Sequence, residues 1–126
     1  MSNFNIVRFI HYILAFLWIY QGIFPKLWFT SKDEIAMWQF MGLSHEIAVI
    51  CGKLGGIAEI IFGTLFIIWG NRLLHYLNLL AMVGLFIVAA VILPQSLIAA
   101  FNPVVMNIAM GSLSIIALSL MENKSS

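Results

Sequence analysis

Residues 47–69 read IAVICGKLGGIAEIIFGTLFIIW, and this stretch decides the fold class. It is apolar almost throughout, and Lys53 and Glu59 are its only charged residues. A helix needs about 20 predominantly apolar residues to cross the hydrocarbon core of a bilayer. The stretch therefore predicts a transmembrane helix.

Three further stretches have the same character: residues 5–24, 73–93 and 103–121. None of them alternates polar and apolar residues as the strands of a membrane barrel do. Gly70-Asn71-Arg72 predicts a tight turn after the second span. Asn102-Pro103 predicts the start of the fourth, because Asn caps helices and Pro fits the first helical position. The sequence thus predicts an all-α integral membrane protein, a four-transmembrane-helix bundle, with residues 1–126 forming a single domain.

One long connection, residues 25–46, follows the first span. Ser31 and Glu34 have the spacing of a capping box, in which the two side chains satisfy each other's backbone amides at a helix start. The apolar run after them ends at Gly42. We expect a short helix over residues 32–42 that is too short to cross the membrane. It would lie at the membrane interface or be partly re-entrant between the spans.

Composition supports the membrane class and excludes several others. The chain is 63% hydrophobic and 9% charged, whereas soluble domains carry about 25% charged residues. A net charge of +1 gives no reason to expect a nucleic-acid partner. Cys51 is the single cysteine, and the histidines lack metal-ligand spacing, so we expect no disulfide and no metal site.

Polar residues inside the spans are candidate site residues, because an ionisable group in lipid is costly and usually faces a partner. Glu59 shares one helical stripe with Gly52, Gly56 and Gly63, and glycines on one face let another helix approach closely. We therefore expect Glu59 to lie in a seam between helices.

The first span offers a matching surface. His11 and Glu59 lie within about one helical turn in depth. Arg8 is nearer the surface, but its long side chain can reach inward, so it could pair with the carboxylate while His11 bridges them. Asn78 of the third span could join this intramembrane polar layer, whereas we expect His75 at the interface beside Arg72. Two interpretations stay open: a buried ion pair that fixes helix register, and a functional polar site.

A second polar set is expected at the opposite mouth of the bundle: Lys26, Lys53, Asn102 and Asn107. Lys26 follows Pro25 at the end of the first span, where it is either a surface anchor or one wall of a pocket. We expect Asn102 to cap a helix and Asn107 to form an interhelical hydrogen bond. Gly22 and Gly111 are expected to be further helix-packing glycines.

Three motifs together carry a family resemblance: YQGIFPKLW at residues 20–28, GKLGGIAEIIFG at 52–63 and FNPVVMN at 101–107. In order and spacing they resemble the DoxX-like family of small bacterial four-helix membrane proteins. The resemblance covers nearly the whole chain. The positions that the family pattern emphasises are Arg8, Gly22, Pro25, Lys26, Gly55, Glu59, Gly63, Asn102, Pro103 and Asn107.

The resemblance implies a place in membrane redox processes. The broader family is named for a membrane component linked to thiosulfate:quinone oxidoreductase. We expect an accessory or ligand-binding subunit without catalysis of its own, with a quinone as the best cofactor candidate. The alternatives are a quinone-linked oxidoreductase subunit, in which Glu59 relays protons through His11, and a small-solute transporter.

Partners and location follow from the same features. We expect the chain to lie in the lipid bilayer and to bind a membrane or peripheral redox partner, a second copy of itself, or both. We expect no nucleic-acid partner. The chain is expected to be a multi-pass protein of the bacterial inner membrane that keeps its first span. Four spans place both termini on one side, and Arg8, Arg72 and Lys124 favour the cytoplasm for that side over Lys26 and Lys32.

Overall fold

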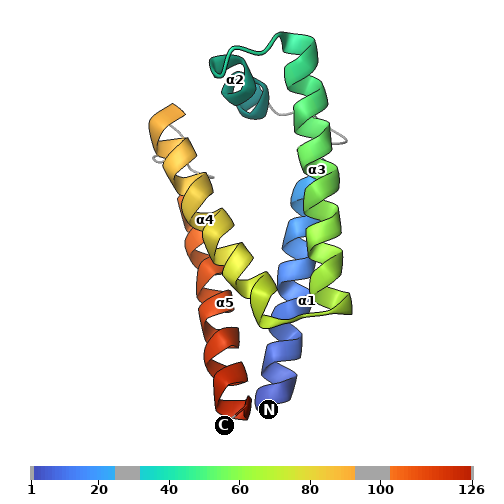
Figure 1. The fold of residues 1–126 in the computed structure, drawn as a ribbon, viewed down its shortest axis with the longest axis vertical. Helices are drawn as coiled ribbons and strands as arrows, with labels where there is room; N and C mark the ends of the chain where they lie inside the picture. The colour runs from blue at the N-terminus through green and yellow to red at the C-terminus, as the bar shows by residue number, and fades with distance from the viewer. Residues whose placement is uncertain (1, 25–31, 93–102, 126) are drawn as a thin grey trace. The chain divides into compact units, whose positions relative to one another are not determined.

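The computed structural model describes residues 2–24, 32–92 and 103–125 of the chain. These residues form five helices and no strand: α1 (Asn3–Gly22), α2 (Lys32–Phe40), α3 (His45–Ile68), α4 (Arg72–Ile92) and α5 (Pro103–Ser125) (Figure 1). Helices α1, α3, α4 and residues Val104–Met121 of α5 are long and apolar enough to cross a membrane. The predicted fold class is confirmed: an all-α membrane protein with four spans and a short helix after the first.

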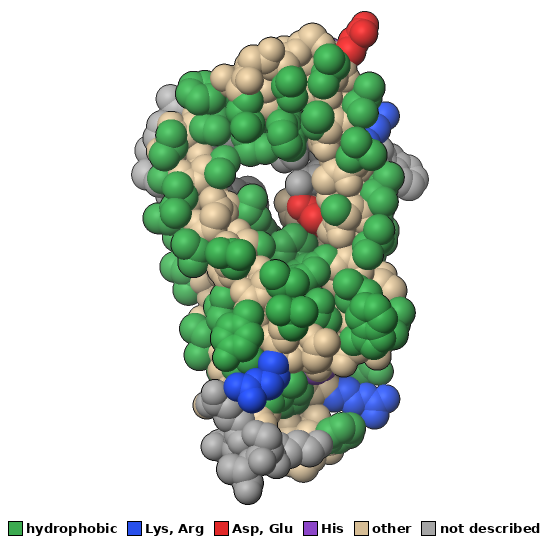
Figure 2. Space-filling model, viewed as in Figure 1, with side chains coloured by type: hydrophobic (Ala, Val, Ile, Leu, Met, Phe, Trp, Pro, Cys, Tyr) green, Lys and Arg blue, Asp and Glu red, His purple; other side chains and the backbone are tan. Residues whose placement is uncertain are grey.

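The side chains that face outward support a lipid environment. Large apolar residues on the spans are strongly exposed, among them Phe16, Leu80 and Val91. Hydrophobic side chains cover most of the face shown in Figure 2. Exposed apolar patches on this scale are unusual in water but are what a hydrocarbon solvent requires.

Side-chain caps fix the starts of three helices. Ser2, Ser44 and Asn71 accept hydrogen bonds from the backbone amides of Asn5, Ile47 and Leu74, respectively. Each cap satisfies an amide that the first turn of a helix leaves without a partner. The last of them confirms the turn predicted at Gly70-Asn71-Arg72.

Helix α2 ends at Phe40, and the glycine that the sequence predicts at its C-terminal end follows two residues later. Gly42 has a φ of 95°, a conformation that glycine adopts without strain. Its amide bonds the carbonyl of Gln39, and the amide of Leu43 bonds that of Trp38, which is the pattern of a Schellman motif. The interfacial position of this helix stays a prediction.

The chain divides into two compact units, and α1 and α3 contribute to both. The first unit comprises residues 1–14 and 66–126, and the second comprises residues 15–65. The organisation as one domain stays a prediction.

In the first unit α4 and α5 pack side by side along their lengths (Figure 1). The buried face of α4 is formed by Leu74, His75, Asn78, Met82 and Ala89. From His75 onward their intervals are three, four and seven residues, as expected for one helical face, and Leu74 lies next to His75. This packing holds the polar residues described below.

In the second unit glycines set the approach of α1 and α3. A Cβ atom on Gly63 would lie 2.8 Å from the carbonyl oxygen of Ala15, and one on Gly22 would lie 2.5 Å from that of Gly56. Both distances are too short for a methyl group. Trp18 packs edge-on against Phe62 in the same seam, with ring centroids 5.1 Å apart.

Candidate functional site

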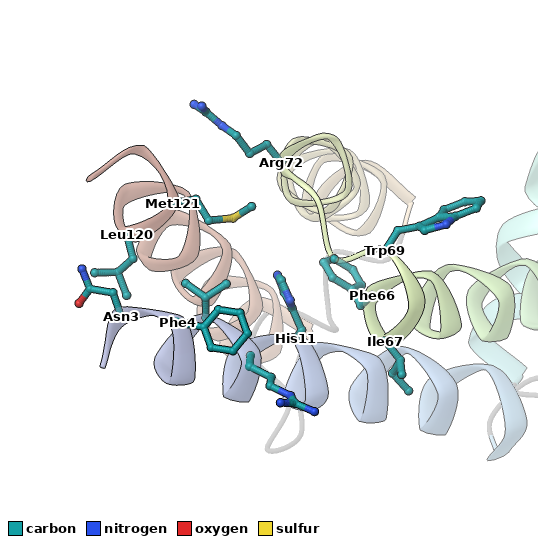
Figure 3. A pocket seen from close by; sticks show the side chains of 12 residues that line it. Asn3, Phe4, His11, Phe66, Ile67, Trp69, Arg72, Leu120 and Met121 are labelled. Atoms are coloured by element: carbon teal, nitrogen blue, oxygen red, sulfur yellow. The ribbon is translucent and has the colours of Figure 1, made fainter. Parts of the chain in front are cut away.

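A pocket of about 510 Å³ lies in the first unit, where the start of α1 meets the ends of α3 and α5 and the start of α4 (Figure 3). Its walls are mainly apolar and aromatic, and a few polar groups interrupt them. The lining residues are Asn3, Phe4, Val7, Arg8, His11, Phe66, Ile67, Trp69, Gly70, Arg72, Leu120 and Met121.

The two cationic residues of the pocket lie on different helices. Arg8 is exposed, and its guanidinium lies 5.8 Å from the ring centroid of Tyr12 and 3.4 Å from its hydroxyl. Arg72 begins α4, and its side chain reaches away from His11 in Figure 3. Among the described residues that line the pocket, Arg8 and Arg72 are cationic and none is acidic.

His11 forms the polar part of the inner wall. Its Nε2 atom lies 2.8 Å from Nε2 of His75, and the two rings stack with centroids 4.9 Å apart. Phe66 packs against both rings, with centroids 6.0 Å from His11 and 5.2 Å from His75. The pair is therefore held in one orientation by an aromatic neighbour as well as by a hydrogen bond.

His75 continues the polar contacts into the packing of α4 and α5. Its Nδ1 atom lies 2.9 Å from the hydroxyl oxygen of Ser114. The amide nitrogen of Asn78 donates to that oxygen at 2.8 Å and to the carbonyl of Met110 at 3.2 Å. His75, Asn78 and Ser114 are fully buried. Together with His11 they form what we call the histidine chain, running from the pocket to Met110.

The missing side chain of Gly70 makes room for the imidazole of His11. A Cβ atom on Gly70 would lie 2.5 Å from Nδ1 of His11 and 2.7 Å from its Cε1. Gly70 also has a φ of 47°, which other residues adopt at a cost. Glycine at this position therefore serves two purposes: it allows the backbone conformation of the turn between α3 and α4, and it leaves room for the imidazole of His11.

The structure brings together part of the predicted intramembrane layer. Asn78 is connected to His11 through Ser114 and His75, and all four lie in the first unit. Glu59 lies in the second unit, in the α1–α3 seam, where its Cβ is 3.3 Å from the place of a Cβ on Gly22. The pairing of Arg8 with Glu59, with His11 as a bridge, stays a prediction.

Two residues of the histidine chain add to the sequence interpretation. We expect His75 at the membrane interface beside Arg72; the structure buries its side chain on the packed face of α4, and its depth in the membrane stays a prediction. Ser114 was not predicted as a site residue. Asn107, Gly111 and Ser114 are spaced by four and three residues, so they lie on one face of the helix. This spacing was the signal that Ser114 faces the other helices.

The opposite-mouth set remains largely a prediction. Lys26 and Asn102 lie outside the described residues, as do Pro25 and Ser31, for which a cap was predicted. Lys53 is exposed on α3, in the second unit. Asn107 is buried and donates to the carbonyl of Met82 at 3.3 Å, which is the expected interhelical hydrogen bond.

The remaining predicted glycines differ in how tightly they are packed. Gly52 and Gly56 are buried on α3, and Gly111 is buried on α5. A Cβ on Gly111 would meet Leu79 at 3.6 Å, an ordinary contact distance. Gly111 therefore lies in the α4–α5 interface, but the interface has room for a larger residue such as alanine at this position.

The histidine chain does not have the composition of a metal site. Among the described residues, no group of three or more His, Cys, Asp and Glu side chains could hold an ion. The two imidazoles are in hydrogen-bond contact with each other, and the next groups are a hydroxyl and an amide. The arrangement can hold and orient a hydrogen-bonding ligand in the pocket.

Fold and site define a multi-pass helical membrane protein with a pocket at the end of its spans. The sequence model of the DoxX-like family matches residues 15–115, and the chain belongs to this family. The match leaves Arg8 and His11 outside its range and includes His75, Asn78 and Ser114. Searches of curated proteins and of solved structures found no match.

Proposed function

We propose that this DoxX-like protein is an accessory membrane subunit that binds a small hydrophobic ligand, with a quinone as the best candidate, in the pocket lined by His11. The single observation that carries the proposal is this pocket, which is mainly apolar and contains an imidazole held in a fixed orientation. Its volume of about 510 Å³ falls within the range of about 300–1,000 Å³ typical of small-molecule sites.

The side chains of the pocket suit a flat ring with polar oxygens. Phe4, Phe66 and Trp69 supply aromatic surface for stacking. His11 supplies a hydrogen-bonding nitrogen at one side, as a ring carbonyl needs. The resemblance to a family linked to quinone chemistry is in keeping with this ligand class.

An accessory role fits the residues that the chain offers. Its sequence has one cysteine and therefore no dithiol pair that could exchange electrons. Redox chemistry would then come from the bound quinone and from a membrane or peripheral partner. The protein would supply binding and orientation.

The proposal is tested by measuring which lipids the purified chain retains. Val7 lines the pocket, and Val7→Phe would fill part of it. Val83→Phe adds the same volume at an exposed position of α4 and is the matched control. We expect mass spectrometry of detergent-purified protein to find quinone with the wild type and Val83→Phe, and strongly reduced quinone with Val7→Phe. Equal retention by all three proteins would contradict the proposal.

A further inference from the structure

We infer that His11 presents its Nδ1–H to the pocket as a fixed hydrogen-bond donor, so that the pocket selects ligands that place an acceptor oxygen beside α1. The inference rests on the proposed function, because it names the ligand chemistry of the same pocket. It follows from which atom donates and which accepts in each hydrogen bond of the histidine chain. These roles are determined at Met110, the end of the chain farthest from the pocket.

The assignment of donors and acceptors begins at Met110. Its backbone carbonyl can only accept, so the side-chain atom of Asn78 that lies 3.2 Å away must be the amide nitrogen. The same nitrogen lies 2.8 Å from the Ser114 hydroxyl oxygen, which therefore accepts from Asn78. Both bonds are buried, where leaving a polar group without a partner is costly.

The role of Ser114 determines the role of His75. Its oxygen accepts from Asn78, and its own O–H is left to donate. Nδ1 of His75 lies 2.9 Å away and takes that hydrogen as an acceptor. In the opposite arrangement Ser114 would receive two donors, and its O–H would have to turn to the carbonyl of Met110 one turn back, which already accepts from Asn78.

His75 then determines the state of His11. A neutral imidazole carries one N–H, so His75 with an accepting Nδ1 carries its hydrogen on Nε2. That hydrogen is donated to Nε2 of His11, 2.8 Å away. His11 in turn carries its hydrogen on Nδ1, the nitrogen beside Gly70.

The described side chains of the pocket offer few acceptors to this donor. Arg8 and Arg72 are donors only, none of the described lining residues carries a carboxylate, and Asn3 supplies one amide oxygen. A ligand with a carbonyl oxygen satisfies His11, whereas a hydrocarbon of the same shape leaves its N–H without a partner. The reduced, hydroxyl form of a quinone is a weaker acceptor and brings a donor of its own.

The chain therefore contains three positioning residues that lie behind the ligand contact: His75, Asn78 and Ser114. They act through His11 by fixing which of its nitrogens holds the hydrogen. Their role predicts a spectroscopic signature that packing alone would not produce.

The first test needs no ligand. Nitrogen NMR of the full chain, labelled at histidine in detergent, reports which ring nitrogen is protonated. We expect Nδ1–H for His11 and Nε2–H for His75, with the exposed His45 as an internal reference. The reversed pattern, with the hydrogen of His11 on Nε2, would overturn the inference.

Two serine variants separate positioning from packing. Ser114→Ala removes the donor to His75 and should produce a mixture of tautomers at both rings. Ser112→Ala is the matched control, since Ser112 lies on the same helix, is exposed and bonds its own helix at Ile108. Unchanged tautomers in Ser114→Ala would also overturn the inference.

The second test compares three ligands that differ only in their oxygens: menadione, its reduced diol and methylnaphthalene. We expect menadione to bind about tenfold more tightly than methylnaphthalene, the worth of one hydrogen bond, with the diol between them. Equal affinities would overturn the inference while leaving the pocket as a binding site. The expected tautomers with no saturable binding of any of the three would overturn the proposed function.

Discussion

Gly70 shows how one residue serves both the backbone and the site. Its φ of 47° suits a turn between two spans, and its missing side chain gives His11 its place. We expect Gly70→Ala to lower the free energy of unfolding by about 1–3 kcal/mol, because it combines backbone strain with overpacking. Thermal melting of the detergent-purified protein, followed by circular dichroism, measures this effect.

The control for this prediction is Gly84→Ala. Gly84 lies within α4, and a Cβ there would meet nothing within 4 Å. Alanine favours a helix over glycine by about 1 kcal/mol, so this variant should melt with the wild type or slightly above it. Equal melting of Gly70→Ala and Gly84→Ala would show that the turn does not need its glycine.

Two buried asparagines on facing helices should differ in their importance. Asn78 donates to both Ser114 and Met110, whereas Asn107 makes a single bond to Met82, and its side-chain oxygen has no hydrogen-bond partner among the described residues. Replacement by leucine keeps the approximate volume and removes the hydrogen bonds. We expect Asn78→Leu to destabilise by about 1–3 kcal/mol and Asn107→Leu by less than 1 kcal/mol. Denaturation of both variants in the same detergent checks the order, and the reverse order would contradict it.

At the scale of helices, glycine spacing decides how closely two spans approach. Gly63 lies against the backbone of Ala15, so Gly63→Ala must push α1 and α3 apart locally. A cost of about 1–3 kcal/mol is expected from such overpacking. Gly111→Ala is the matched variant in the other unit, where the added methyl would meet Leu79 at an ordinary distance. Thermal melting should show a clear loss for Gly63→Ala and little change for Gly111→Ala. A larger loss for Gly111→Ala would contradict the account.

The sequence predicted the helices well because long apolar runs determine them. The span predicted at residues 47–69 is found as α3, His45–Ile68, and the helix predicted at 32–42 is found as α2, Lys32–Phe40. The largest difference is at α5, which continues to Ser125 rather than ending at residue 121. Hydropathy shows where a span leaves the hydrocarbon, and a helix can continue in polar residues beyond that point.

The site was predicted only in part, and the reason is geometric. Spacing placed Asn78 and His11 at a similar depth, but depth does not say which neighbours their side chains meet. The contact of His11 with His75, and of His75 with Ser114, depends on how three helices are rotated about their axes. A serine in a span also bonds its own helix readily, as Ser112 does, so its type alone did not indicate a site.

At the scale of the whole chain, the two termini should lie on the same side of the membrane. Asn3 and Phe4 line the same pocket as Leu120 and Met121, so the first turn of α1 lies near the end of the fourth span. Reporter proteins fused separately to the N-terminus and to the C-terminus would measure this. We expect both reporters to show the same side, and the charge distribution predicts the cytoplasm. Reporters on opposite sides would contradict the four-span arrangement.

The central claim, that the pocket beside His11 binds a small quinone-like ligand, is tested most directly by a menadione binding isotherm. The measurement uses the detergent-purified chain and His11→Phe, which keeps a ring against Phe66 and removes both nitrogens. The account predicts saturable binding to the wild type and about tenfold weaker binding to His11→Phe, the effect of losing one hydrogen bond. Unsaturable uptake that is the same for both proteins, as partition into the micelle would give, would contradict it.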